Sequence, residues 1–490
     1  MLQEIQQTLD EANRAQQVWA RQLLRKRLTA VGRVASLIAE HYDDLVGAIE
    51  RPNASKSEKL ASEVMPLADA CRFTARTGRQ VLAPKSMSMF NGAWWMGRLA
   101  IRQHAEPWGT VLILAPSNYP LLLPGVQVIQ AVAAGNSVIV KPAPECEQVM
   151  HRLVDLLIDA DIPQGVVQVV GTSIELAQGY LQQGVDKVVL TGSVHTGRAV
   201  LRQLAETLTP ATVELSGCDA VLVLPQAKLD EVVDCLSYGL RLNGGATCIA
   251  PRRIFATPSH NRIAKALKEK LLANGESAAR VPQRILGQVQ RCVQEALDAG
   301  AKLVSGRIPR DGDSSMRPIV LDEVTPEMEI ARSDIFAPVS SVIRVESVED
   351  ALKADRKCPY GLGMSIFGPR SYAEHWAEQI DAGCVVINDI IVPTADPRVT
   401  FGGRDQSGWG STRGRTGLLE MTRPKAVCVR KGSWRPHLDK RNADNAEMLA
   451  CLLRIFHARG LKSRFAAMQK LAGMVMDQRR ADQEKAKKQD

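Results

Sequence analysis

The chain has 490 residues, of which 45% are apolar and 23% are charged, with ten cysteines and a formal net charge of +9. These proportions are typical of a soluble globular protein of two or three domains that can bury a core without disulfides. No two cysteines have the CxxC spacing, none lies at metal-ligand spacing from a histidine, and no run of about 18 apolar residues occurs. We therefore expect no metal site, no membrane-spanning helix, reduced thiols and a cytoplasmic location.

The basic excess is concentrated near the C-terminal end. Residues 436–490 carry 12 Lys and Arg against 7 Asp and Glu, a net charge of +5, so the first 435 residues carry 50 against 46, or +4. A nucleic-acid-binding protein needs its basic residues gathered on the folded body. We therefore expect no nucleic-acid partner. The first residues alternate polar and apolar at helical spacing and lack the apolar core of a signal peptide.

The periodicity predicts helices over 2–83 and then a change of pattern. From Gly109, short apolar runs alternate with amphipathic helices, which is typical of a doubly wound parallel sheet. The expected strands are 111–114, 137–140, 166–170, 187–190, 212–215 and 220–224. The expected helices are 124–134, 147–160, 173–183 and one that ends near 207. Ligands of such sheets bind at the carboxyl ends of the strands.

A second α/β block is predicted over 217–404. Its expected helices are 228–241, 259–273, 283–298 and 371–382, and its expected strands are 253–256, 301–304, 338–345 and 384–388. A loop rich in Gly and Arg follows over 402–417, and 427–430 reads as a short strand.

The last segment differs in composition and predicts two helices, 444–457 and 461–485, separated at Gly460. Five residues form one apolar stripe on the second helix: Leu461, Phe465, Met468, Leu471 and Val475. Such a stripe favours packing onto the body or a partner over contact with a membrane surface.

One thiol, Cys248, stands among small residues in the stretch 243–253, NGGATCIAPRR. Small neighbours leave a thiol reachable and let backbone N–H groups approach its ligand, as a nucleophilic cysteine requires. A buried core cysteine is the alternative interpretation.

Other candidate residues lie at the ends of predicted strands. Glu214 could act as a general base or could be an ion-paired glutamate. Lys141 could reach a ribose or phosphate, or could be a solvated lysine, and Asn118 could donate to an oxyanion or serve a turn. The loop 192–197, GSVHTG, joins a strand to a helix, where glycines let a pyrophosphate approach the helix N-terminus. It lacks the GxGxxG pattern, and we assign no role to His195.

The order and spacing of these signals resemble the aldehyde dehydrogenase superfamily up to about residue 435. The collinear motifs are PWGTVLILAPSNYP at 107–120, VKP at 140–142, LTGS at 190–193, VELSG at 213–217, NGGATC at 243–248, DIFAP at 334–338 and FGGRDQSG at 401–408. Because the motifs are many and collinear, the resemblance is specific.

The resemblance implies a site. Cys248 is similar to the nucleophile, which forms a hemithioacetal and then a thioester with an aldehyde substrate. Asn118 and the backbone N–H of Cys248 would hold the oxyanion, and Glu214 would activate the hydrolytic water. NAD or NADP is the implied cofactor. Its expected contacts are Lys141, Gly192, Ser193, Leu215, Asp334 and Phe336.

The sequence departs from the family pattern beside the expected cofactor. Asp334 stands where glutamate is usual, Ala246 where glutamine is usual, and Ser216 where glycine is usual. Pro144 stands where many NAD-preferring relatives carry an acid, so the choice between NAD and NADP stays open.

The implied architecture is an aldehyde dehydrogenase-like α/β fold with a Rossmann-type cofactor domain, an α/β catalytic domain and a small bridging element for a homodimer or homotetramer. The expected bounds are 1–88 with 106–216 for the NAD(P)-binding domain, 217–418 for the catalytic domain, 89–105 with 419–435 for the oligomerisation element, and 436–490 for a basic helical extension. Candidate residues for an aldehyde tunnel are Trp108, Tyr119, Leu122, Leu123 and Tyr238.

The expected reaction is oxidation of an aldehyde to a carboxylic acid. A CoA-acylating enzyme is one alternative, which the presence of Glu214 disfavours. A cofactor-binding protein of low activity on the same fold is the other, motivated by the departures at 216, 246 and 334.

Overall fold

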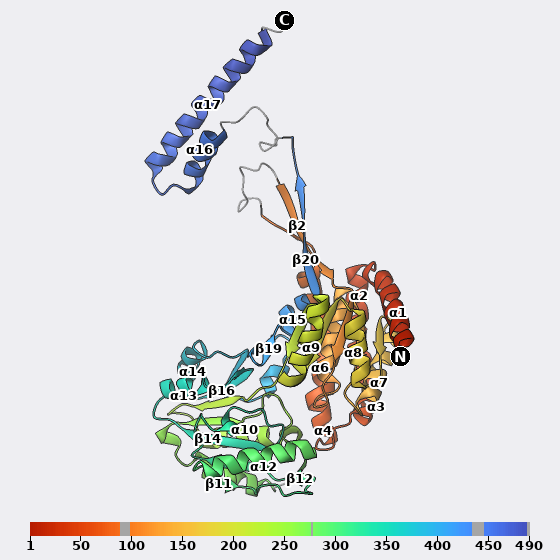
Figure 1. The fold of residues 1–490 in the computed structure, drawn as a ribbon, viewed down its shortest axis with the longest axis vertical. Helices are drawn as coiled ribbons and strands as arrows, with labels where there is room; N and C mark the ends of the chain where they lie inside the picture. Colours follow the sequence, from red (N-terminus) through yellow and green to blue (C-terminus); the bar gives the residue numbers. More distant parts are fainter. Residues whose placement is uncertain (89–98, 276–277, 434–444, 488–490) are drawn as a thin grey trace. The chain divides into compact units, whose positions relative to one another are not determined.

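The computed structural model describes residues 1–88, 99–275, 278–433 and 445–487. The chain forms two compact units (Figure 1). The first comprises Met1–Ala83 and Ala105–Pro424, and the second comprises Pro84–His104 and Lys425–Asp490. The predicted oligomerisation segment 89–105 and the predicted extension 436–490 lie partly outside the described residues, and the division into four domains stays a prediction.

The N-terminal part is helical, as the periodicity predicts. Its helices are α1 (Leu2–Ala20), α2 (Leu24–Glu40), α3 (Tyr42–Ala48), α4 (Lys56–Lys59) and α5 (Met65–Leu82). Between α4 and α5 the chain makes one π turn, η1 (Leu60–Val64), so that these three elements form one continuous helical run. A π turn adds a residue to the helical repeat and rotates the side chains around it.

The first unit contains a six-stranded sheet in the order β19-β7-β6-β3-β4-β5. Five strands are parallel: β3 (Thr110–Leu114), β4 (Ser137–Lys141), β5 (Val167–Val169), β6 (Lys187–Thr191) and β7 (Ala211–Glu214). The short β19 (Gly408–Trp409) joins the edge antiparallel to β7. The connecting helices are α6 (Leu122–Ala134), α7 (Glu147–Asp159), α8 (Ile174–Gln183) and α9 (Val194–Thr207). The predicted doubly wound sheet is confirmed.

A seven-stranded sheet in the same unit has the order β11-β13-β14-β9-β8-β16-β17. Its strands are β8 (Ala220–Val223), β9 (Arg253–Ala256), β11 (Lys302–Ser305), β13 (Ile319–Asp322), β14 (Val339–Arg344), β16 (Gly363–Phe367) and β17 (Cys384–Ile387). Its helices are α10 (Leu229–Arg241), α11 (Ile263–Ala273), α12 (Gln283–Asp298), α13 (Val348–Asp355) and α14 (Arg370–Ala377). All strands except β11 run parallel to their neighbours.

Two local predictions need correction. The helix expected over 371–382 ends at Ala377, and the loop expected over 402–417 gives way to a helix, α15 (Gly414–Glu420). The glycines of α15 serve close packing rather than flexibility. A Cβ at Gly417 would lie 2.6 Å from the carbonyl carbon of Thr412 and 2.9 Å from Oε1 of Gln130.

The second unit contains a three-stranded sheet and a helical hairpin. The sheet has the order β1-β2-β20, with β1 (Lys85–Ser86), β2 (Leu99–Pro107) and β20 (Thr422–Arg430). The hairpin consists of α16 (Asn445–His457) and α17 (Leu461–Lys487), which pack through Cys451, Ile455 and Ala467. Among the described residues, no helix is long and apolar enough to cross a membrane.

Candidate active site

Cys248 follows a tight turn at the end of α10. The 3-10 turn η4 (Leu242–Gly245) contains three consecutive residues with positive φ: Asn243 at 49°, Gly244 at 59° and Gly245 at 76°. The left-handed backbone explains the two glycines, because side chains there are strained. Gly217 lies against the same turn, since a Cβ there would stand 2.5 Å from the carbonyl oxygen of Cys248. The backbone that carries the thiol is thus confined from two sides.

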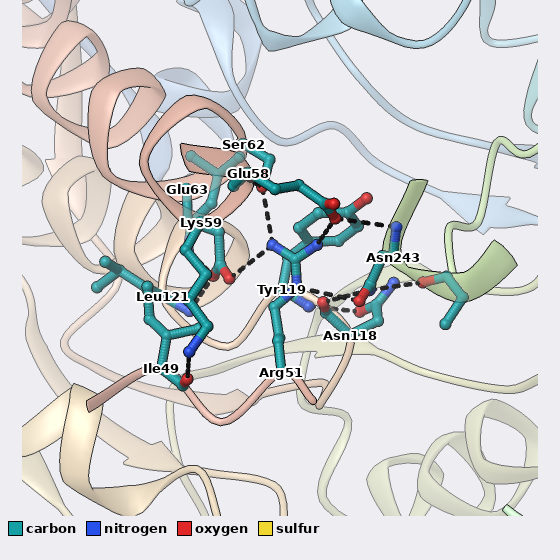
Figure 2. Close-up of polar contacts among 12 residues, drawn as sticks. Ile49, Arg51, Glu58, Lys59, Ser62, Glu63, Asn118, Tyr119, Leu121 and Asn243 are labelled. Atoms are coloured by element: carbon teal, nitrogen blue, oxygen red, sulfur yellow. Dashed lines mark hydrogen bonds and ion pairs between the residues drawn. The ribbon is translucent and has the colours of Figure 1, made fainter. Parts of the chain in front are cut away.

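The asparagine of this turn is held by a buried arginine from the loop between α3 and α4 (Figure 2). Arg51 Nε donates to Oδ1 of Asn243 at 3.1 Å, and its Nη2 donates to Oε1 of Glu58 at 2.9 Å. Glu58 Oε1 also accepts the backbone N–H of Asn243 at 3.0 Å. Asn243 Nδ2 in turn donates to the carbonyl of Asn118 at 2.9 Å. The loop of Asn118 and the turn of Cys248 are therefore tied to each other through Asn243.

Arg51 also orients the start of α6. Its Nη1 donates to Oε1 of Glu63 at 3.1 Å, and Oε2 of Glu63 accepts the backbone N–H groups of Leu121 at 2.7 Å and Leu122 at 3.2 Å. A carboxylate at a helix N-terminus satisfies N–H groups that have no partner within the helix. The side chain of Leu121, the N-cap residue, makes no such bond, so Glu63 caps α6 from a distant part of the chain.

Cys248 borders a pocket of about 820 Å³. Four of the five residues proposed for an aldehyde tunnel, Tyr119, Leu122, Leu123 and Tyr238, border the same pocket. Trp108 does not fit that prediction, because its Nε1 donates to the carbonyl of Glu420 at 3.0 Å and its ring lies under the ammonium of Lys187. The pocket is lined partly by aromatic and aliphatic side chains, with Glu58, Arg241 and Arg280 also on its wall.

Tyr119 is fixed at both ends. Its hydroxyl lies 2.7 Å from Oγ1 of Thr247, and the guanidinium carbon of Arg51 lies 4.5 Å from its ring centroid. A cation over an aromatic face is attracted by the ring quadrupole. This side chain thus offers the pocket a rigid aromatic wall next to Cys248.

Burial, together with the charges of Asp219 and Glu214, raises the pKa of the Cys248 thiol to about 12, although the charge of Arg413 acts to lower it. The thiol is therefore protonated near neutral pH, and its activation needs a proton acceptor or added positive charge.

Glu214 ends β7 and is almost completely buried. Burial raises the pKa of its carboxyl group, while a hydrogen bond from Thr412 and the charge of Arg413 lower it. A carboxylate with a raised pKa is a better proton acceptor at neutral pH. The side chain of Asn118 is turned back on its own loop, since its Oδ1 accepts the N–H of Tyr119 at 3.1 Å.

Four of the six residues expected to hold a cofactor, Lys141, Gly192, Ser193 and Leu215, lie at the carboxyl edge of the six-stranded sheet. Lys141 ends β4, and burial lowers the pKa of its ammonium group. Ser193 caps α9, with its hydroxyl accepting the N–H of Thr196 at 3.2 Å, and Gly192 donates to the carbonyl of Glu214 at 3.0 Å. The backbone N–H of Leu215 donates to the carbonyl of Ser407 at 2.9 Å.

The second glycine of the loop 192–197 has a packing role. A Cβ at Gly197 would lie 2.7 Å from Cδ2 of Leu215. The absence of a side chain at 197 therefore lets α9 lie close to β7. Packing alone explains Gly197, whereas a Cβ at Gly192 would make only ordinary contacts, 3.6 Å from Cδ1 of Leu190 and 3.9 Å from Cβ of Thr196.

Asp334 lies in a second buried cluster of charges. Burial raises the pKa of its carboxyl group to about 6, whereas Arg252 and the hydroxyl of Ser216 lower it. Its Oδ1 is buried and, among the described residues, has no hydrogen-bond partner. Phe336, two positions on, is half-buried and packs against the core of the seven-stranded sheet. An unpartnered buried carboxylate oxygen fits a hydroxyl donor such as that of a ribose.

Arg413 is a residue of this site that was not foreseen from the sequence. It borders the pocket, is buried and has a positive φ of 62°. Its Nη1 donates to the carbonyl of Thr394 at 2.5 Å, and its guanidinium lies over the ring of Phe401. Its position inside a loop rich in Gly and Arg gave no signal that this one arginine turns inward. Arg51 and Glu58 were also missed, because their partner Asn243 lies far along the chain.

No group of three or more His, Cys, Asp or Glu residues suited to a metal ion occurs in the described ranges. The site is instead a thiol in a partly apolar pocket, with a buried carboxylate and a nucleotide-type sheet in the same unit. A thiol on a pocket wall and a doubly wound sheet in the same unit fit the class of nucleotide-dependent oxidoreductases.

Comparison with known proteins agrees with that class. The family model described as the aldehyde dehydrogenase family matches residues 2–427, and the chain belongs to this family of NAD(P)-dependent oxidoreductases. The 4,4'-diapolycopene aldehyde oxidase of a Methylomonas species is 30% identical, over 86% of this chain and 80% of its own length. The NADP-dependent succinate-semialdehyde dehydrogenase of Deinococcus radiodurans is also 30% identical, over 86% of this chain and 90% of its own.

Solved structures show the same fold. The NADP-dependent glyceraldehyde-3-phosphate dehydrogenase of Bacillus halodurans, complexed with NADP, is 26% identical with a TM-score of 0.81, over 88% of this chain and 92% of its own. The Mycobacterium tuberculosis aldehyde dehydrogenase complexed with NAD+ is 25% identical with a TM-score of 0.81, over 88% of this chain and 91% of its own. The predicted family, fold and enzyme class are confirmed.

Proposed function

We propose that this chain oxidises an aldehyde to a carboxylic acid with NAD+ or NADP+ through a covalent adduct on Cys248. The observation that carries the proposal is the position of Cys248 on the wall of a pocket that is bordered by rigid aromatic and aliphatic side chains. A pocket of about 820 Å³ has the size of small-molecule sites in general.

The first chemical step is attack of the Cys248 sulfur on the aldehyde carbon. A C–S bond forms, the carbonyl oxygen becomes an oxyanion, and the thiol proton must leave. We assign Glu214 as the proton acceptor, because its raised pKa makes its carboxylate a stronger base. Arg413 favours the thiolate, because its charge lowers the pKa of Cys248. Because the Asn118 oxygen is engaged by the backbone, its NH₂ end is the end we assign to the oxyanion.

NAD(P)+ supplies the hydride acceptor that converts the hemithioacetal to a thioester. We assign its binding to Lys141, Gly192, Ser193, Leu215, Asp334 and Phe336. The unpartnered Oδ1 of Asp334 fits a ribose hydroxyl, and the N-terminus of α9 fits an anionic group.

The last step is hydrolysis. Before this step Glu214 has to pass the thiol proton on to solvent, so that it is a carboxylate again. Water attacks the thioester carbon, Glu214 takes a proton from that water, and the Cys248 sulfur leaves as a thiolate with the carboxylic acid released. A buried carboxylate with a raised pKa suits this transfer, and for this reason we prefer water to CoA as the acyl acceptor.

The test is formation of reduced nicotinamide with a panel of aldehydes, including long apolar aldehydes and succinate semialdehyde, with NAD+ and NADP+ in parallel. Cys248→Ala should abolish turnover, and Cys428→Ala, at an exposed cysteine, should not change it. The acid should appear equally with and without CoA. Turnover by Cys248→Ala would refute the covalent route, and an acyl-CoA product would favour the acylating alternative. Absence of turnover with every aldehyde would favour the cofactor-binding alternative.

We also propose a homodimer or homotetramer in the cytoplasm. The nine-residue strand β20 is an edge strand of its sheet and its side chains, Val427 and Val429 among them, are exposed, as expected of a strand that can pair with another copy. Ten cysteines without disulfides fit a reducing compartment. Light scattering of the purified chain and cell fractionation test the two statements.

A further inference from the structure

The helical hairpin α16–α17 leaves most of its apolar side chains uncovered. The two helices bury Cys451, Ile455 and Ala467 between them, with Leu471 and Met474 partly covered. Of the five residues in the apolar stripe of α17, the hairpin covers only Leu471 in part. The other four, Leu461, Phe465, Met468 and Val475, stay exposed.

The exposed side chains recur at helical spacing. On α17 they follow intervals of four, three and seven residues, so they share one face of the helix, with Leu461 82% and Phe465 62% exposed. On α16, Leu449 and Leu453 stand four residues apart and are likewise exposed. The hairpin therefore presents an apolar stripe on each of its helices in addition to the surface that joins them.

The middle of the hairpin carries charge of one sign, although Glu447, Asp477, Asp482 and Glu484 lie nearer its two ends. Residues 448–476 contain five basic side chains and no acidic one: Arg454, Arg459, Lys462, Arg464 and Lys470. Arg459 and Lys462 are exposed, on either side of Gly460 where the two helices meet. Lys470 pairs with Glu447, just outside this range. Exposed Leu, Phe and Met beside unopposed Lys and Arg are the composition of helices that lie in the plane of an anionic lipid surface.

We propose that the α16–α17 hairpin docks on an anionic lipid surface, with Leu461 and Phe465 in the interface and Arg459 and Lys462 at the headgroups. From the apolar stripe alone we expected packing onto the body or a partner, and the charge beside the stripe is what reverses that expectation. A second copy laid on the same face would bring two sets of cations together, which costs free energy. The first 435 residues carry a net +4 and offer no opposite overall charge either. A bilayer containing anionic lipid supplies both an apolar layer and the missing negative charge.

This docking is independent of the proposed reaction and can be measured without turnover. The full chain is sedimented with vesicles of phosphatidylcholine alone or of phosphatidylcholine mixed with phosphatidylglycerol. We expect binding to the mixed vesicles to be at least about tenfold stronger than to neutral ones and to weaken as salt is added.

Two variants separate the apolar and the charged contributions. Leu461→Ser/Phe465→Ser and Arg459→Glu/Lys462→Glu should each reduce binding to the mixed vesicles about tenfold or more. Leu272→Ser, at an exposed leucine of α11, and Lys268→Glu on the same helix are the matched controls and should bind as the unaltered chain does. Circular dichroism checks that each variant keeps its helices.

The proposal is overturned if the unaltered chain stays in the supernatant with the mixed vesicles, or if either tail variant sediments with them as well as the controls do. Light scattering tests whether a second copy of the chain occupies the apolar stripe instead. An oligomer that Leu461→Ser/Phe465→Ser dissociates, without vesicle binding by the unaltered chain, would assign the stripe to a second copy.

Discussion

Two buried arginines lie near Cys248, and their surroundings differ. Arg51 donates through all three of its nitrogens, to Asn243, Glu58, Glu63 and Ser62 (Figure 2). Arg252 donates to the carbonyls of Ala337 and Gly245 at 2.5 and 2.6 Å, yet its Nε has no hydrogen-bond partner within the described residues.

The carboxylates near these two arginines, Glu63 and Asp334, differ in the same way. Both oxygens of Glu63 are engaged, one by Arg51 and one by two backbone N–H groups. Asp334, beside Arg252, has a buried oxygen without a partner in the described ranges. A hydrogen-bond network in which every polar group is paired rigidifies the residues in it. A buried polar group left unpaired costs free energy unless a ligand completes its hydrogen bonds. The Arg51 cluster is thus a scaffold for the substrate wall, and the Arg252 cluster is where we expect the cofactor.

Removing the scaffold cation should have the largest effect. Arg51→Met leaves the fully buried Glu63 and the partly exposed Glu58 without their cation, and we expect the free energy of unfolding to fall by about 3–5 kcal/mol. Urea denaturation measures it. Arg33→Met, at an exposed arginine paired with Asp161, is the control and should cost less than about 1 kcal/mol. A loss as small as the control's would mean that the Arg51 cluster is not a scaffold.

Removing the unpartnered acid should act on cofactor binding instead. Asp334→Asn should weaken NAD(P) binding about tenfold or more, because a hydrogen bond to a charged group is lost. The free energy of unfolding should not fall, because burial disfavours the charged form that the substitution removes. Titration of the reduced cofactor's fluorescence measures the binding without turnover. Asp396→Asn, whose carboxylate pairs with Arg398 on the surface, is the control. Equal affinity in both variants would remove Asp334 from the cofactor site.

The same residue predicts a pH dependence. Because the folded pKa of Asp334 is about 6, the carboxylate is present above that pH and is lost as the pH falls through it. Cofactor affinity should therefore fall below about pH 6 in the unaltered chain and should lose this dependence in Asp334→Asn. An identical pH profile in the two proteins contradicts the assignment.

Alkylation of Cys248 should report the charge around the thiol. With a pKa of about 12, its reaction with iodoacetamide should be slow at neutral pH and rise about tenfold per pH unit. Arg413→Leu raises the pKa further and should slow the reaction several-fold, whereas Arg415→Leu, at an exposed neighbour, should not. Peptide mass spectrometry gives the rates. A plateau below pH 9 would show that another group activates the thiol.

The smallest effect is expected from Ser216→Gly. Its hydroxyl lowers the pKa of Asp334, so its removal should shift the midpoint of the pH profile of cofactor binding upward by under about one pH unit. An unchanged midpoint would show that Ser216 does not reach the carboxylate in solution.

The fold was predictable because its signals are local. Apolar runs such as 137–140 and 187–190 alternate with amphipathic helices, and the structure places strands there. Strands β13 and β16 were missed: β13 has only four residues, and β16 begins with a glycine and contains a serine. Tyr119, Leu122 and Leu123 were among the tunnel candidates, and the structure places them on the wall of the pocket.

The scaffold was not predictable. Arg51 and Asn243 are 192 positions apart, and nothing in either neighbourhood marks them as partners. The departures at Ser216 and Asp334 were visible in the sequence. Only the structure puts Ser216 beside Asp334 and shows that, among the described residues, Oδ1 of Asp334 has no hydrogen-bond partner. The catalytic and cofactor roles of the individual residues stay predictions until the variants are measured.

The π turn Leu60–Val64 makes helix length part of the active site. It sets the angle at which Glu63 leaves the helical run that also carries Glu58, and Glu63 caps α6, which bears Leu122 and Leu123. Deleting one residue from this turn would give a regular α-helix and turn Glu63 about 100° away from α6. The shape of the pocket thus depends on the number of residues in this helical run, which also lines the pocket with Ser57, Glu58, Ala61 and Ser62. A deletion there would change the pocket while every proposed catalytic residue is retained.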